Sequence, residues 1–312
     1  MSKLFNEDLG ISSNKTTLAK LQNKFSNYDP SYVSIATMST LNDFREWLEL
    51  IWKQYKPYAD GNFPNEFKYQ FYQRAWELYL GSTLINRDYA LGTHDSVGPD
   101  FKIPYEDKGL ERSAWIEAIA VKKGDGKDKV PDIKYGVAVS VPEQEMLLRL
   151  TSGLGEKYQK YLSYLRGGIV EPSDPFIIAI DRSALEHTDP QIPLILKCLF
   201  AIGHQVLFIK SNKPLPKTEE SNWFGREKVN KISGSEVPML LFRDSDFEDI
   251  SAVIYCANNI LNSPRDAKLM GNNFVIVHNP FAKNPFPENF FKFGEEWKQE
   301  GEQLKKIKTP NR

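Results

Sequence analysis

The segment Ala114–Val121 constrains the fold most, because it is a strand-like run that is apolar on both faces apart from one carboxylate, Glu117. Alternate side chains of an extended strand share a face. The neighbours of Glu117 are apolar on its own face (Trp115, Ile119, Val121) and on the opposite face (Ile116, Ala118). A lone carboxylate buried in such a strand is costly unless it serves a purpose. The alternative, in which Glu117 faces solvent on a one-sided sheet, is disfavoured by these neighbours.

Helical and strand patterns alternate along the chain and predict an α/β fold. Helical spacing indicates helices over residues 40–56, 66–84, 142–166 and 194–201, and a short one over 17–25. Apolar, β-branched runs indicate strands over residues 100–103, 114–121, 176–180, 205–209 and 274–278. The charged tail, 295–312, is expected to be partly helical.

These elements predict a mixed central β-sheet flanked by helices. Residues 1–60 are expected to form a helical N-terminal extension, of which the first 36 residues are a loose polar lead-in. Residues 61–312 are expected to form one α/β domain.

Composition excludes several classes of protein. With 40 Lys+Arg against 41 Asp+Glu the net charge is −1, so the chain is no globally basic nucleic-acid coat, although a local basic groove is compatible with this total. Two cysteines are too few for a disulfide framework or a cysteine-rich zinc site. The N-terminus lacks the apolar run of a signal peptide, and no window approaches the ~18 apolar residues of a membrane span. We therefore expect a cytoplasmic protein with no membrane partner.

Common nucleotide-binding and hydrolase motifs do not occur in the sequence: there is no GxxxxGK[ST], GxGxxG, HExxH or GxSxG. The four histidines are scattered without metal-ligand spacing. Carboxylates at unusual strand positions are the remaining candidates for chemistry.

Asp100 and Glu117 are predicted to face each other across a β-hairpin. Pairing them places the centre of the hairpin between Lys108 and Gly109, where the polar turn lies. Directly opposed residues share one face of a sheet, with Cβ atoms about 5 Å apart. Two carboxylates at that distance repel each other unless one is protonated or a cation lies between them. Mg²⁺, which takes one or two carboxylates together with phosphate oxygens and water, is the economical answer.

Three short motifs follow one another within residues 66–180, before a further helix and strand. They are Arg74-Ala-Trp-Glu77 on a helix, then Gly98-Pro-Asp-Phe101 and Trp115-Ile-Glu-Ala118 on strands. This order resembles the core of the PD-(D/E)XK superfamily, the restriction-endonuclease-like nucleases. The resemblance implies phosphodiester hydrolysis with Mg²⁺ or Mn²⁺, in which Glu77, Asp100 and Glu117 are catalytic and the last two are metal ligands. It also implies nucleic acid as the partner, with DNA favoured.

One departure concerns the lysine that this superfamily usually carries two residues after the glutamate, where this chain has Ile119. Some members supply that charge from the next helix, which here carries Lys157 and Lys160. At about 100° per residue, Lys157 lies roughly 50° from the centre of the apolar stripe of this helix, and Lys160 about twice as far round. We predict that Lys157 points inward and is catalytic, and that Lys160 behaves as a surface residue. Lys122 is the next candidate.

Glu77 is predicted to face the same cavity, because it lies with Leu80 and Leu84 on the packed side of its helix. The alternative is an ion pair with Arg74 on the helix surface.

A metal-dependent nuclease is the favoured function. The alternative is a catalytically inactive nuclease-fold module that binds nucleic acid or a protein partner, which the Ile119 departure and the near-zero net charge favour. An enzyme acting on another substrate is a third possibility, since fold does not fix function. Four lysines after the Glu117 strand either contact phosphates or form a solvated loop: Lys122, Lys123, Lys127 and Lys129.

Overall fold

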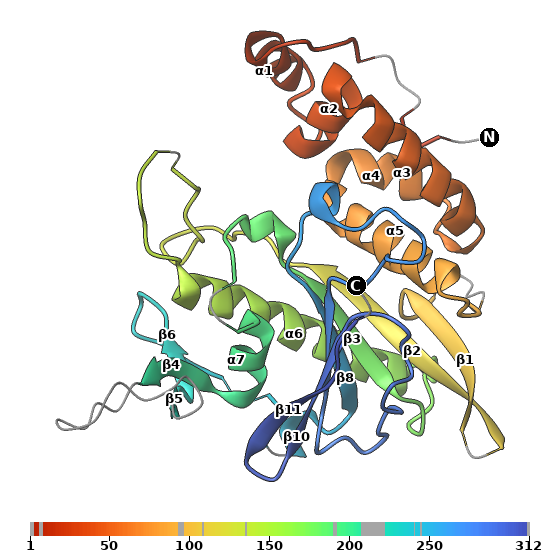
Figure 1. The fold of residues 1–312 in the computed structure, drawn as a ribbon, viewed down its shortest axis with the longest axis vertical. Helices are drawn as coiled ribbons and strands as arrows, with labels where there is room; N and C mark the ends of the chain where they lie inside the picture. The colour runs from red at the N-terminus through yellow and green to blue at the C-terminus, as the bar shows by residue number, and fades with distance from the viewer. Residues whose placement is uncertain are drawn as a thin grey trace.

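Seven strands form the central sheet, in the spatial order β1-β2-β3-β8-β9-β10-β11 (Figure 1). The computed structural model describes residues 3–5, 9–92, 97–107, 109–134, 136–189, 192–206, 222–239, 241–243 and 245–310. The strands are β1 (Phe101–Asp107), β2 (Leu110–Ala120), β3 (Phe176–Asp181), β8 (Ile250–Cys256), β9 (Phe274–His278), β10 (Glu295–Glu300) and β11 (Gln303–Lys308). Strands β2, β3 and β8 run parallel, whereas β1 pairs with β2, and β9 with β8, in antiparallel fashion. The predicted α/β fold with a mixed sheet is confirmed.

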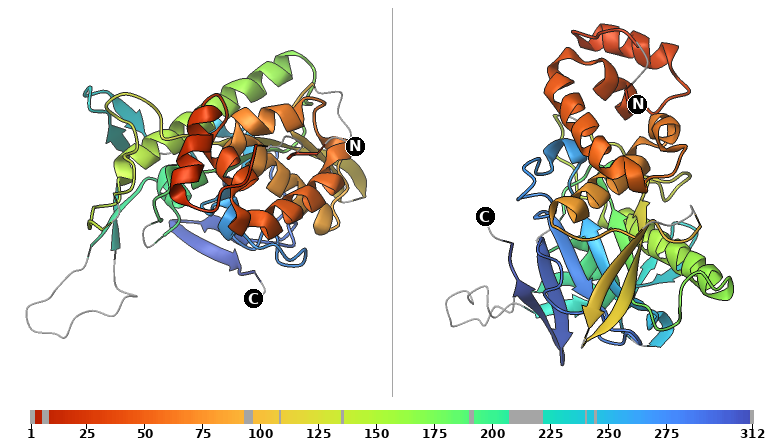
Figure 2. Two further views of the ribbon diagram at one scale, coloured as in Figure 1. Left: turned by 90° about the horizontal axis from the view of Figure 1, so that it is seen from above. Right: turned by 90° about the vertical axis from the view of Figure 1, so that its right-hand side faces the viewer.

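Helices cover both faces of this sheet. They are α1 (Lys15–Lys24), α2 (Pro30–Thr37), α3 (Asn42–Tyr55), α4 (Phe63–Tyr69), α5 (Phe71–Asn86), α6 (Glu143–Arg166) and α7 (Leu194–Phe200). Two small two-stranded sheets lie apart from the main one: β4 (Ile202–Val206) with β5 (Asn222–Gly225), and β6 (Lys228–Asn230) with β7 (Glu236–Pro238). Helices α1–α4 stack over α5 at the end of the molecule away from these small sheets (Figures 1 and 2).

The strands divide the interior into two hydrophobic cores, because alternate side chains point to opposite faces. One core joins α3 and α5 to Ile116 and Ala118 of β2. The other joins α6 and α7 to Trp115 and Ile119 of the same strand. β2 is therefore covered on both sides, as its apolar sequence predicts, and Glu117 belongs to the face that α6 covers.

The N-terminal segment is more ordered than a loose lead-in, so that expectation is wrong for its described residues. Asp29 caps α2, where its carboxylate accepts a hydrogen bond from the Ser31 backbone N–H (2.8 Å). Tyr32 and Val33 of that helix are fully buried. The apolar residues of α2 cluster on consecutive positions, which hides the helical period from sequence inspection.

Three predicted elements differ in the structure. The helix expected over 66–84 is broken at Gln70, which leaves helical geometry between α4 and α5. The strand expected over 205–209 is described only as far as residue 206; it belongs to a small sheet, and β8 takes the place beside β3. The charged tail forms the β10–β11 hairpin instead of a partial helix.

Ion pairs join the two strands of the tail hairpin. Lys306 of β11 contacts Glu295 of β10 (2.6 Å), and Lys305 forms an ion pair with Glu300. Lysines are common on exposed edge strands, where they discourage pairing with another chain. Among the described residues, no helix is long and apolar enough to cross a membrane.

Candidate functional site

The β1–β2 hairpin has the register that the sequence predicts. Asp107 pairs with Leu110 and Phe101 with Ile116, so the next position places Asp100 opposite Glu117. Gly109 adopts a positive φ of 79° in the turn, while Lys108 lies outside the described residues. The backbone register therefore places the two acids opposite each other where the β1 edge of the sheet ends.

Beyond the end of β1, side chains instead of a paired strand form hydrogen bonds with the backbone of β2. The Ala118 backbone N–H donates to Asp100 Oδ2 (2.7 Å). Gln73 of α5 donates through Nε2 to the Ala118 carbonyl (3.2 Å) and accepts from the Ala120 N–H (2.8 Å). These bonds satisfy backbone groups of β2 and tie α5 to the strand. Sequence inspection did not identify Gln73, since a glutamine on a helix carries no signal of this bond.

Glu117 is fully buried and is held by residues of α6. Lys157 Nζ and Lys160 Nζ both donate to its Oε1, at 2.8 and 2.7 Å. The Tyr164 hydroxyl lies 3.2 Å from Glu117 Oε2 and 2.9 Å from the Gly98 carbonyl. The inward orientation predicted for Lys157 is confirmed, since this residue is only 8% exposed.

Lys160 is exposed, as its helical phase predicts, but its contact with Glu117 was not predicted. Its side chain is 45% exposed, yet its flexible stem is long enough to bring the ammonium group from the helix edge to Glu117. Burial lowers the pKa of Lys160, but the neighbouring Glu117 carboxylate outweighs this effect and the pKa is raised. Helical phase predicts the direction in which a side chain leaves the helix. It does not predict where the ammonium group at the end of a flexible lysine lies.

Gly153 allows α6 to approach β2 closely. A Cβ atom at this position would lie 2.7 Å from Val121 Cγ1 and 3.5 Å from Ile119 Cδ1. Any larger residue would push the helix away from the strand. This glycine therefore brings Lys157, one turn further along α6, within reach of Glu117.

Glu77 of α5 is buried beneath the hairpin. It accepts a hydrogen bond from the Tyr55 hydroxyl (2.9 Å) and forms an ion pair with Arg74. Burial, together with the negative charge of Asp100, raises the pKa of Glu77 to about 8. The surface ion pair considered as an alternative does not describe this buried group. Arg74 and Asp100 line the neighbouring cavity, but Glu77 is not among its lining residues, so the prediction that Glu77 itself faces this cavity is wrong.

Asp100 and Glu117 have donor atoms suited to a hard divalent cation. Burial, followed by the charge of Glu117, raises the pKa of Asp100 to about 6. Such mutual repulsion is relieved by a cation, and Mg²⁺ uses one or two carboxylates. Within the described ranges, however, no three His, Cys, Asp or Glu side chains group as they would around a metal ion. Any ion held here would complete its coordination with water or substrate.

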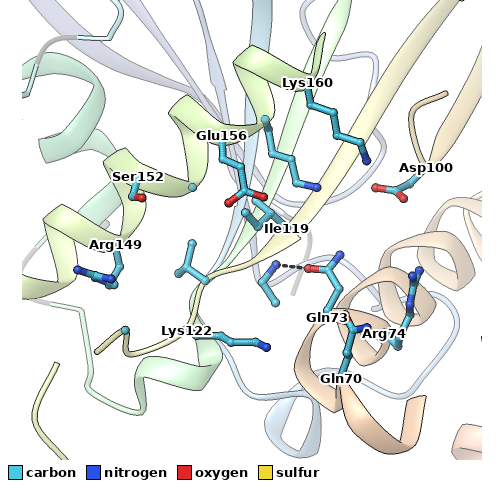
Figure 3. A pocket seen from close by; sticks show the side chains of 15 residues that line it. Gln70, Gln73, Arg74, Asp100, Ile119, Lys122, Arg149, Ser152, Glu156 and Lys160 are labelled. Atoms are coloured by element: carbon cyan, nitrogen blue, oxygen red, sulfur yellow. Dashed lines mark hydrogen bonds between the residues drawn. The ribbon is translucent and has the colours of Figure 1, made fainter. Parts of the chain in front are cut away.

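A cavity of about 500 Å³ opens beside these residues, between α5 and α6 at the carboxyl end of β2 (Figure 3). Open α/β sheets commonly bind ligands at the carboxyl ends of parallel strands. Five cationic side chains and two acidic ones line it: Arg74, Lys122, Arg149, Lys157 and Lys160, with Asp100 and Glu156.

The lysines that follow β2 separate into two groups. Lys122 lines the cavity, whereas Lys123 forms ion pairs with Asp132 and Glu186. Lys127 and Lys129 are exposed and are not among the residues that line the cavity. Of the four lysines predicted to contact phosphate, only Lys122 lines the cavity. Arg149 also lines it, and sequence inspection did not identify this residue.

No protein-family model, curated protein or solved structure matches this chain. The function of the site therefore has to be argued from its own geometry and charge.

Proposed function

We propose that the chain is a metal-dependent nuclease that hydrolyses phosphodiester bonds of nucleic acid, with DNA favoured. The observation that carries the proposal is the buried Glu117, which binds two lysines and faces Asp100 beside a basic cavity. Five cationic side chains against two acidic ones in the lining leave net positive charge in the cavity, which suits a phosphate.

Asp100 and Glu117 would hold Mg²⁺ or Mn²⁺, which prefer carboxylate oxygens. The chemistry that such an ion supplies is polarisation of the scissile phosphate and a lower pKa of the attacking water. The protein's own groups keep the two acids in place. The Ala118 N–H orients Asp100, and the lysines with Tyr164 orient Glu117.

Lys157 and Lys160 take the place of the lysine that Ile119 displaces. Both ammonium groups are fixed beside Glu117 before substrate binds, so they stabilise negative charge that develops on the phosphate without reorganising. Glu77 acts through another residue: its ion pair with Arg74 positions the guanidinium at the cavity wall.

Cleavage of single- and double-stranded DNA and RNA with Mg²⁺ or Mn²⁺, with and without chelator, tests the proposal. Glu117→Gln should reduce the rate at least 10³-fold, because it removes a ligand and the anchor of both lysines. Glu111→Gln, an exposed glutamate on the same strand, is the matched control and should cleave normally. Cleavage that survives both Glu117→Gln and chelator would refute the proposal.

Separate removal of the two lysines tests their roles. Lys157→Ala should lower kcat about 100-fold and Lys160→Ala about tenfold, with metal affinity little changed, because a transition-state contact is lost. Equal and full activity in both variants would place the positive group elsewhere, with Lys122 as the next residue to change.

A catalytically inactive nucleic-acid-binding module is the second candidate. It is favoured by Glu117 Oε1, which two ammonium groups already engage. Such a module would bind oligonucleotides equally well with and without Mg²⁺ and would cleave none of them.

A further inference from the structure

The cations of the cavity are arranged along α6. Figure 3 shows Arg149, Ser152, Glu156 and Lys160 following one another on this helix, with Asp100 facing the Lys160 end. Lys122 extends into the cavity from the segment after β2. Arg149 and Lys157 are eight residues apart, which at 1.5 Å per residue is about 12 Å.

These cations differ in whether a protein carboxylate neutralises them. Lys157 and Lys160 are paired with Glu117, and Arg74 with Glu66 and Glu77. In the described part of the chain, Arg149 and Lys122 form no ion pair. They are therefore the cations whose charge is available to a ligand.

Arg149 also carries an unsatisfied donor. Its Nε–H is buried without a hydrogen-bond acceptor among the described residues. A Cβ atom on Gly124 would lie 2.1 Å from its Nη1, so the glycine makes room for the guanidinium at this end of the cavity. The guanidinium group lines the cavity, so its charge is within reach of an anionic ligand.

We propose that the cavity binds one polynucleotide strand laid along α6, with Arg149 contacting a phosphate remote from the cleaved one. This inference rests on the proposed function. At the 3.4 Å rise of one DNA strand, the 12 Å between Arg149 and Lys157 corresponds to about three to four nucleotides. Lys122 contacts a phosphate between the two ends.

The size of the cavity selects a single strand. At about 500 Å³ the cavity falls within the roughly 300–1,000 Å³ of ordinary ligand pockets, so it cannot enclose a duplex. Glu156 lies between the cationic ends and repels phosphate. The strand consequently contacts the helix at two separated points instead of along a continuous basic surface.

Binding measured in chelator tests the inference without requiring cleavage. Fluorescent oligothymidylates of two, four, eight and twelve nucleotides are titrated by anisotropy over a range of salt concentrations. Arg149→Gln should weaken binding of the twelve-mer about three- to tenfold and reduce the slope of log K against log[salt] by about 0.7. It should not change binding of the dinucleotide, which has one phosphate and cannot span the cavity.

Three controls sharpen the result. Arg149→Lys keeps the charge and should retain the salt slope. Arg166→Gln removes an exposed arginine from the same helix outside the cavity and should bind as the unmodified protein does. Glu156→Gln should strengthen binding of the twelve-mer severalfold, because it removes the repelling charge.

Different outcomes overturn the two proposals. Equal binding by Arg149→Gln and Arg166→Gln, or tighter binding of a blunt duplex than of the single strand, would refute the strand site. A protein that shows the expected Arg149 effect but never cleaves with metal would keep the strand site and refute the nuclease.

Discussion

Two buried acidic clusters lie near the ends of adjacent parallel strands and differ in the space beside them. Asp100, just before β1, lines a cavity of about 500 Å³, and Glu117 of β2 is bound to two other lining residues, Lys157 and Lys160. Asp181 at the end of β3 borders a pocket of only about 10 Å³. The comparison teaches that two clusters of buried charge in one protein can differ in whether a ligand could reach them. Room for a ligand beside that charge distinguishes the two clusters.

The polar residues at the end of β3 and just after it, which we call the β3 cluster, form hydrogen bonds with protein groups. Asp181 accepts from the Ser183 hydroxyl (2.6 Å). Arg182 pairs with Asp189 (2.8 Å) and donates through Nε to the Tyr255 hydroxyl (2.7 Å). The polar groups of this cluster are thus directed at each other, which is what a structural network requires.

The largest expected difference between the clusters is catalytic. Asp100→Asn should lower metal-dependent cleavage at least 10³-fold, or about 4 kcal/mol of transition-state stabilisation. The same substitution in the other cluster, Asp181→Asn, should leave the rate within about threefold. Initial rates under saturating Mg²⁺ compare them. Similar losses in both variants would mean that the cavity does not separate function from structure.

The β3 cluster should dominate stability. Arg182→Met leaves Asp189 and the Tyr255 hydroxyl without their cationic partner in a buried setting, so the free energy of unfolding should fall by about 3–5 kcal/mol. Urea denaturation measures it. Arg243→Met, which removes an exposed arginine paired with Glu227, should cost less than about 1 kcal/mol. Comparable losses would show that Arg182 is not structural.

Asp181 should also make stability depend on pH. Burial raises its pKa from 3.8 to about 7, so between these values the folded state binds more protons than the unfolded state. Its contribution to stability is therefore greatest at low pH and falls as pH rises from about 4 to about 7, by up to about 4 kcal/mol. Asp181→Asn removes this dependence, so the stability of the variant relative to the unmodified protein should increase between pH 5 and pH 8. Parallel urea midpoints at both pH values would contradict this.

The smallest expected effects on stability are those of two glycine substitutions in α6, the helix that carries Lys157 and Lys160. Gly153→Ala should destabilise the protein by about 1–3 kcal/mol, because its methyl group meets Val121. Gly155→Ala, two residues along the same helix in open space, should stabilise it by about 0.5–1 kcal/mol. Thermal unfolding measures whether each variant is less or more stable than the unmodified protein. Stabilisation by both would show that α6 does not need its close approach to β2.

Local sequence patterns predicted the hairpin well, and long-range packing poorly. The register of Asp100 and Glu117 follows from a polar turn between two short strands, so it is readable within twenty residues. The bonds of Gln73, the reach of Lys160 and the position of Arg149 depend on how α5 and α6 meet β2. No spacing within one segment encodes them.

Missed strands have a related explanation. The strand β8, Ile250–Cys256, is apolar apart from Ser251 and buried on both faces, so it lacks the alternation that marks a strand with one solvent-exposed face. The β10–β11 hairpin was missed for the opposite reason, because its charged residues on a sheet edge resemble those of a solvated helix or tail. In both cases the segment forms a strand because it pairs with neighbouring strands of the sheet.

The chain order of the first cluster has a consequence for how the protein is made. Asp100 and Glu117 are joined by a short hairpin, whereas the contact from Glu117 to Lys157 spans 40 residues. Synthesis delivers the N-terminal residues first, and closing a long loop costs more entropy than closing a short one. The two acids therefore meet before α6 is available. Until that helix docks, the two acids lack the cationic partners that they have in the folded protein, and their repulsion is screened by water and salt.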